Sequence, residues 1–140
     1  MSNYDEEQVE TVVGGKSDAE YKNDIAARER EVTKALNGGR PQDALPFALS
    51  DPPVYTKTAA IKDANADIVI KLLIGFKEKD IDAAVDSLDS DQLDVLMKYI
   101  YRALGTTTET SSLLFKWHES TLKKGGLGAI MRVISEKKTV

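Results

Sequence analysis

The sequence predicts an all-α protein of about seven short antiparallel helices, forming a compact bundle or a short curved stack of helical hairpins behind an extended acidic N-terminal arm. Apolar residues recur at helical spacing from residue 17 onward. Turn and capping residues divide the chain into segments joined by short links, which favours antiparallel neighbours. No segment alternates polar and apolar residues for long enough to predict a strand.

The composition predicts one soluble globular domain. The chain has 140 residues, of which 41% are hydrophobic and 30% charged. The absence of cysteine excludes disulfides and thiolate sites. No apolar run is long enough to cross a bilayer and no signal segment opens the sequence, so we expect a cytoplasmic protein that does not contact membranes.

Acidic residues are concentrated at the N-terminal end of the chain. Residues 1–20 carry a net charge of -5, and the remaining 120 residues carry +1. We therefore expect a flexible acidic arm over residues 1–16 and a single helical domain over residues 17–140. An acidic segment without apolar periodicity is either a solvated tail or an arm that contacts a basic partner.

A capping box predicts where the first helix begins. The Ser17 hydroxyl can accept from the Glu20 amide while the Glu20 side chain reaches back. The run 37–39 (NGG) predicts its end. The helix between them has an apolar face consisting of Tyr21, Ile25, Val32 and Leu36.

Two prolines and a threonine divide the next part of the chain. Pro41 suits the first position of a short helix, in which Pro46 should produce a kink or fraying. The apolar face of this short helix consists of Ala44, Leu45, Ala48 and Leu49. Thr56 is the predicted cap of a central helix, whose wide apolar stripe comprises Ala60, Ile61, Ala64, Ile68, Val69, Leu72, Leu73 and Phe76.

Four more helices are predicted after the central one. Asp80 and Ser90 are the predicted caps of the first two, and Gly105 closes the second. A polar loop follows at 106–110. The four apolar faces consist of Ile81, Ala84, Val85 and Leu88; of Leu93, Leu96, Met97, Ile100, Tyr101 and Leu104; of Leu113, Leu114, Trp117, Thr121 and Leu122; and of Leu127, Ile130, Met131, Val133 and Ile134.

The glycine-rich run from Gly125 to Gly128 raises the question of phosphate binding. In a Walker loop the lysine follows the glycines, but here Lys123 and Lys124 precede them. A dinucleotide fingerprint would need glycine at Met131, after a strand rather than a helix. The run is better explained as a corner between two helices, where Gly125 or Gly126 takes a left-handed conformation and Gly128 allows close helix approach.

The remaining polar residues do not predict catalysis. His118 is the single histidine and has no strained nucleophile turn beside it, so a packed or surface role is favoured. The aspartates between Asp80 and Asp94 lack the central glycine of a calcium loop. The sequence pI of about 5.1 disfavours nucleic-acid binding. We expect no enzyme activity, no cofactor and no metal.

One tyrosine is a candidate for partner binding. Tyr99 and Tyr101 are two residues apart, so their side chains point about 200° away from each other on a helix. We place Tyr101 in the core and Tyr99 on the surface, where exposed tyrosine is favoured at interfaces.

An ordered set of segments resembles a known family. The set includes 51–53 (DPP), 68–77 (IVIKLLIGFK), 95–104 (VLMKYIYRAL), 113–120 (LLFKWHES) and 125–140 (GGLGAIMRVISEKKTV). Together they resemble subunit 5 of the actin-related protein 2/3 complex, the assembly that nucleates branched actin filaments. The resemblance covers about residues 35–140, and the ordered set is more specific than any single segment.

The resemblance implies a non-catalytic structural subunit of the actin cytoskeleton. Family members pack against subunit 4 and the beta-propeller subunit 1, and an acidic N-terminal segment reaches towards actin-related protein 2. The acidic start of this chain resembles that segment, which makes Tyr4, Asp5 and Glu6 candidate partner-binding residues beside Tyr99. Two alternatives are a stand-alone helical adaptor for other partners and a nucleotide-binding protein using the Gly125–Gly128 loop.

Overall fold

A computed structural model describes residues 16–106, 111–135 and 138–140. Within these residues it contains seven α-helices, one 3-10 helix (η1) and no strand, which confirms the all-helical class. The elements are α2 (Asp18–Asn37), η1 (Pro41–Asp43), α3 (Leu45–Leu49), α4 (Ala59–Ile74), α5 (Glu78–Asp86), α6 (Ser90–Leu104), α7 (Ser111–Gly125) and α8 (Leu127–Ser135).

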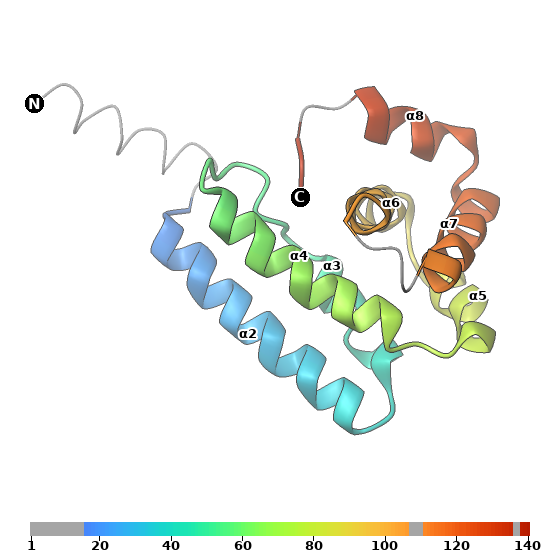
Figure 1. Cartoon of the computed structure of the whole chain (residues 1–140), viewed down its shortest axis with the longest axis horizontal. Coiled ribbons are helices and arrows are strands. Elements are labelled where there is room, and N and C mark those ends of the chain that lie inside the picture. Colours follow the sequence, from blue (N-terminus) through green and yellow to red (C-terminus); the bar gives the residue numbers. More distant parts are fainter. Residues whose placement is uncertain (1–15, 107–110, 136–137) are drawn as a thin grey trace, which may run out of the picture.

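The long helices α2 and α4 lie side by side and run in the same direction (Figure 1). Near their N-terminal ends, Thr56 Oγ1 donates to Asp18 Oδ1 at 2.8 Å. At the other end, a Cβ on Gly75 would clash with Leu36 Cδ2, so glycine allows the close approach there. The prediction of antiparallel neighbours is therefore wrong for this pair, because η1, α3 and the segment 50–58 lead the chain back before α4 begins.

Helix α6 lies at the centre and contacts α3, α4, α7 and α8. Its side chains Leu96, Met97 and Ile100 are completely buried. Trp117 of α7 belongs to the same core. Its ring packs edge-on against Phe76 with ring centroids 4.9 Å apart, and its Nε1 donates to the Leu73 carbonyl at 2.9 Å. The core is thus shared by helices from both halves of the chain.

The predicted capping box at the start of α2 is confirmed. The Ser17 hydroxyl accepts from the Glu20 amide at 3.2 Å, and the Glu20 carboxylate accepts from the Ser17 amide. The other three predicted caps are wrong by one to three positions, because several polar residues near each start compete for the role. The residues at these positions are Thr58 rather than Thr56, Lys77 rather than Asp80, and Asp89 rather than Ser90.

Pro41 and Pro46 lie at the starts of two separate short helices, rather than within one helix that is kinked at Pro46. Pro41 begins η1 and Pro46 lies in the first turn of α3, where the missing amide hydrogen leaves no bond unmade. The predicted apolar face of this region is buried as expected. In α4, Ala60 and Ala64 are exposed rather than buried, and the polar Asn65 lies in the core instead.

Candidate interaction surface

The glycine-rich run forms the corner between α7 and α8, as predicted. Helix α7 ends at Gly125, and Gly126 is the single residue before α8, with a left-handed φ of 73°. Its amide donates back to the Leu122 carbonyl at 2.7 Å, as in a helix terminus. Gly126 therefore uses its conformational freedom, and its amide, to end one helix and begin the next.

The prediction that Gly128 allows close helix packing is wrong. A Cβ at Gly128 would lie 3.0 Å from Nη1 of Arg132, a side chain of the same helix, and the nearest atoms all belong to that guanidinium. Arg132 Nε also donates to Asp94 Oδ2 of α6 at 2.7 Å. Glycine at 128 thus leaves room for the arginine that ties α8 to α6.

Three apolar side chains of α8 face away from the body. Leu127 is 68% exposed, Met131 60% and Ile134 74%, whereas Ile130 and Val133 are half-buried and pack against the core. We call Leu127, Met131 and Ile134 the α8 ridge. The sequence placed all five in one apolar face, and the structure shows that only two of them contact the rest of the chain's core.

The prediction that Tyr99 is exposed is wrong. Its side chain is fully buried, and its hydroxyl accepts from Asn65 Nδ2 of α4 at 2.6 Å. Burial raises the pKa of Tyr99 above its ordinary value. The positions expected for Tyr99 and Tyr101 are exchanged. Helix α6 is covered by other helices on several sides, so the part of its circumference that is buried is wider than one apolar stripe.

Tyr101 occupies the surface position instead. It is 36% exposed, its hydroxyl lies 3.0 Å from His118 Nε2, and the two rings stack edge to face at 5.3 Å. Tyr99 therefore presents no surface to a partner of the folded chain, while Tyr101 and His118 form a surface contact between α6 and α7.

A buried arginine connects α2, α4 and α6. Arg28 is 3% exposed; its Nη1 donates to Asn65 Oδ1 at 2.5 Å and its Nη2 to the Ser50 carbonyl at 2.6 Å. Asn65 in turn donates to Tyr99, so the three side chains form one chain of hydrogen bonds. This network was not predicted from the sequence, although Arg28 lies at helical spacing from the apolar Ile25 and Val32, which indicates a position on the buried face of α2.

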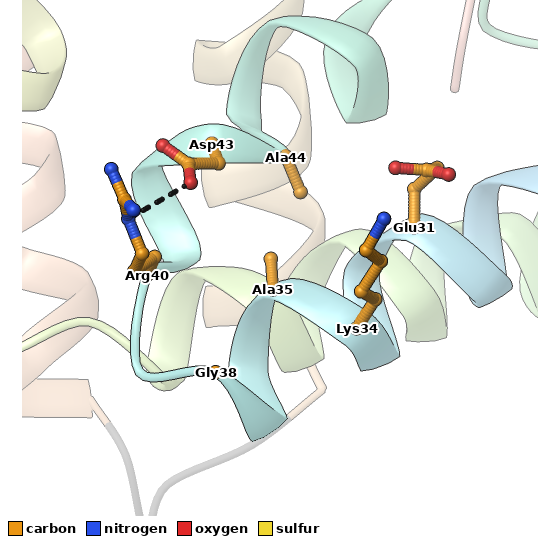
Figure 2. Close-up of a pocket in the computed structure, with 7 residues that line it drawn as sticks. All are labelled: Glu31, Lys34, Ala35, Gly38, Arg40, Asp43 and Ala44. Carbon is orange, nitrogen blue, oxygen red and sulfur yellow. Dashed lines mark ion pairs between the residues drawn. The ribbon is translucent and has the colours of Figure 1, made fainter.

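A surface pocket of about 350 Å³ lies where the C-terminal end of α2 meets η1 (Figure 2). Arg40 and Asp43 point toward one another across it and form an ion pair of 3.1 Å, with both side chains more than half exposed. Its other lining residues are Glu31, Lys34, Ala35, Gly38 and Ala44. Because its charged side chains are exposed to solvent, this pocket does not have the convergent buried polar groups of a ligand site.

The predicted arm residues Tyr4, Asp5 and Glu6 lie outside the described residues. Lys16, which the sequence assigned to the arm, pairs with Asp24 at 2.6 Å and also with Asp51. These carboxylates raise the pKa of Lys16 to about 12. The last residue of the predicted arm is therefore bound to the helical body.

The described part of the chain shows neither a metal cluster nor a membrane span. It contains no group of three or more His, Asp or Glu side chains placed to hold an ion. None of its helices combines the length and the apolar character needed to cross a bilayer. What the geometry does offer is an all-helical body with an exposed apolar helix, which is the character of a protein-interaction module.

Comparison with known proteins identifies the family. The model of the p16-Arc family, the 16 kDa subunit of the ARP2/3 complex, matches residues 2–140. The chain is 65% identical over 138 residues to actin-related protein 2/3 complex subunit 5 of Dictyostelium discoideum, covering 99% of both chains. It is 43% identical over 113 residues to subunit 5-C of Xenopus laevis, covering 80% of this chain and 75% of that one.

A subunit 5-like protein of Homo sapiens is 45% identical over 111 residues, covering 79% of this chain and 72% of the relative. The chain therefore belongs to the p16-Arc family. This is a family of structural subunits without catalytic activity, which confirms the expectation that the protein is not an enzyme.

Proposed function

We propose that the chain is a structural subunit of an ARP2/3 complex in the cytoplasmic actin cytoskeleton, where it supports nucleation of branched actin filaments. The observation that carries this proposal is the 65% identity to Dictyostelium subunit 5 over 99% of both chains. The helical body packs on neighbouring subunits, namely subunit 4 and the beta-propeller subunit 1. The N-terminal arm tethers actin-related protein 2.

The physical basis of the tether is effective concentration. A segment joined to a body that is already bound meets its second partner as an intramolecular neighbour, which strengthens binding without new contacts elsewhere. The segment 1–15 carries four acidic residues and no basic residue, so it suits a partner surface rich in lysine and arginine. Tyr4, Asp5 and Glu6 are the residues that we propose make this contact.

Affinity capture of the tagged full chain from a cell extract, followed by mass spectrometry, tests membership of the complex. We expect recovery of the actin-related proteins together with the other subunits. Recovery of unrelated partners without any actin-related protein would instead support the stand-alone adaptor.

Deletion of residues 1–15 tests the tether. Lys16 and Ser17 are kept, because the first pairs with the body and the second caps α2. We expect an unchanged circular dichroism spectrum, retained binding to the other subunits and docking of actin-related protein 2 weakened by about tenfold or more.

A point variant with a matched control sharpens this test. Tyr4→Ala combined with Asp5→Asn and Glu6→Gln should weaken docking of actin-related protein 2, whereas Ser2→Ala combined with Asn3→Ala should not. Equal docking by the deletion, the triple variant and the unaltered chain would refute the tether while leaving membership of the complex intact.

A further inference from the structure

We propose that Thr139 is a phosphorylation site, and that a phosphate there fastens residues 138–140 across α4 and α6. We call residues 138–140 the strap. A protein kinase supplies the phosphoryl group from ATP. This role is separate from membership of the complex, because the contacts that support it lie within the chain itself.

The strap returns from α8 towards α4 and α6 and is held by both helices (Figure 1). Lys62 Nζ of α4 donates to Thr139 Oγ1 at 2.9 Å. Arg102 Nη1 of α6 donates to the main-chain oxygen of Val140 at 3.3 Å. The Val140 side chain is 3% exposed and belongs to the core. The Thr139 hydroxyl therefore lies at the point where the strap meets α4.

The positive charge of Lys62 is poorly compensated in the described structure. Its side chain is half-buried, and its hydrogen bond goes to a neutral hydroxyl. Burial, followed by the charge of Arg102, lowers the pKa of Lys62 below its ordinary value. A phosphate on Thr139 carries a charge of about -1.5 to -2 at pH 7. Phosphorylation thus replaces a neutral acceptor by a strongly negative one beside an ammonium that lacks such a partner.

A pocket of about 330 Å³ next to the strap offers space for the phosphate. Thr139 lines it together with Lys98, Tyr101, Arg102, Val133, Lys138 and Val140. Arg102 also pairs with Asp63, and Lys98 and Lys138 have contacts of their own. We therefore assign Lys62 as the direct partner of the phosphate, while the other three cations add to the positive potential around it.

The strap is suited to act as the substrate of a kinase. Thr139 is exposed, and the strap is neither helix nor strand. The Thr139 oxygen attacks the γ-phosphorus of ATP, the catalytic aspartate of the kinase takes the hydroxyl proton, and ADP leaves. Because Val140 is buried, the kinase acts while the strap is detached. The phosphate then favours its return to Lys62.

Chemical denaturation of the full chain with phosphothreonine incorporated at position 139 tests the fastening. We expect the equilibrium constant for unfolding to fall by about fivefold to tenfold, because a charge-assisted hydrogen bond replaces a neutral one. In a Lys62→Met background the effect of the phosphate should shrink to about twofold or less. Lys71→Met is the matched control, since Lys71 is an exposed lysine of the same helix, and it should leave the effect intact.

The titration of Lys62 gives a second measurement that does not depend on stability. Nuclear magnetic resonance of the lysine side chains follows each ammonium separately. Phosphorylation should raise the pKa of Lys62, because a nearby negative charge favours the protonated form. The titration of Lys71 should not change.

Mass spectrometry of the tagged full chain, recovered from cells treated with phosphatase inhibitors, tests whether the site is used. We expect phosphate at Thr139 and none at this position in Thr139→Val. Absence of phosphate from Thr139 would overturn the assignment of the site. An unfolding constant that is unchanged or raised by the phosphate, an equal effect in the Lys62→Met background, or an unchanged Lys62 titration would overturn the fastening. None of these results bears on whether the chain is recovered with the actin-related proteins.

Discussion

Helices α6 and α8 both carry apolar residues at helical spacing, yet their environments are opposite. Leu96, Met97 and Ile100 of α6 are fully buried, whereas the α8 ridge is 60–74% exposed. Helix α6 contacts four other elements, while α8 packs against α6 and α7 with one side. The comparison shows that a helical apolar pattern predicts that a face will be covered, but does not predict whether the same chain covers it.

Met97 of α6 and Met131 of α8 form a matched pair, and the largest expected effect on stability is at Met97. Met97→Ala should lower the free energy of unfolding by about 2–5 kcal/mol, because it removes a fully buried side chain and leaves a cavity in the core. Chemical denaturation monitored by circular dichroism measures this loss. A loss below about 1 kcal/mol would mean that α6 is less tightly packed than the comparison requires.

The two tyrosines of α6 extend the comparison to polar groups. Tyr99→Phe should cost about 1–2 kcal/mol of unfolding free energy, because it leaves the buried Asn65 amide without its acceptor. Tyr101→Phe is the control, and should cost less than about 0.5 kcal/mol because water can replace an exposed hydroxyl. Equal losses in the two variants, measured by denaturation, would contradict the assignment of Tyr99 to the core.

The contact of Asp18 with the segment before α4 predicts that stability depends on pH. Hydrogen bonds from Thr58 and Thr56 lower the pKa of Asp18 below its ordinary value of 3.8. A carboxyl with a lower pKa in the folded state stabilises the fold above its unfolded pKa, and this contribution disappears as the pH falls through its folded pKa.

Asp18→Asn should therefore cost about 0.5 kcal/mol near pH 7, and the difference from the unaltered chain should shrink as the pH falls from about 4 towards 2. Denaturation at a series of pH values measures it. A difference that stays constant or grows on acidification would show that Asp18 does not act through its charge.

The smallest effect on stability is expected at the ridge. Met131→Ala should change the unfolding free energy by less than about 0.5 kcal/mol, because the side chain is 60% exposed in the isolated chain. Thermal unfolding of Met131→Ala and Met97→Ala, measured under the same conditions, checks this prediction. A loss comparable to that of Met97→Ala would place Met131 in the core and remove the contrast between the two helices.

The sequence by itself determined the local features of this protein. The capping box at Ser17 and the glycine corner at Gly126 involve atoms within a few residues of each other, so their residue types are enough to specify them. The all-helical class follows equally from spacing along the chain. Most of the core is also predicted correctly, because a helical stripe identifies the face that must be covered.

Tertiary structure decided the features that depend on distant parts of the chain. Tyr99 is buried because α4 presents Asn65 to it, and Arg28 is buried because Asn65 and the Ser50 carbonyl accept its hydrogen bonds. The parallel run of α2 and α4 and the exposure of the α8 ridge depend in the same way on how helices are placed. Periodicity within one helix reports which side is apolar, but only the packing of separate helices decides what lies against that side.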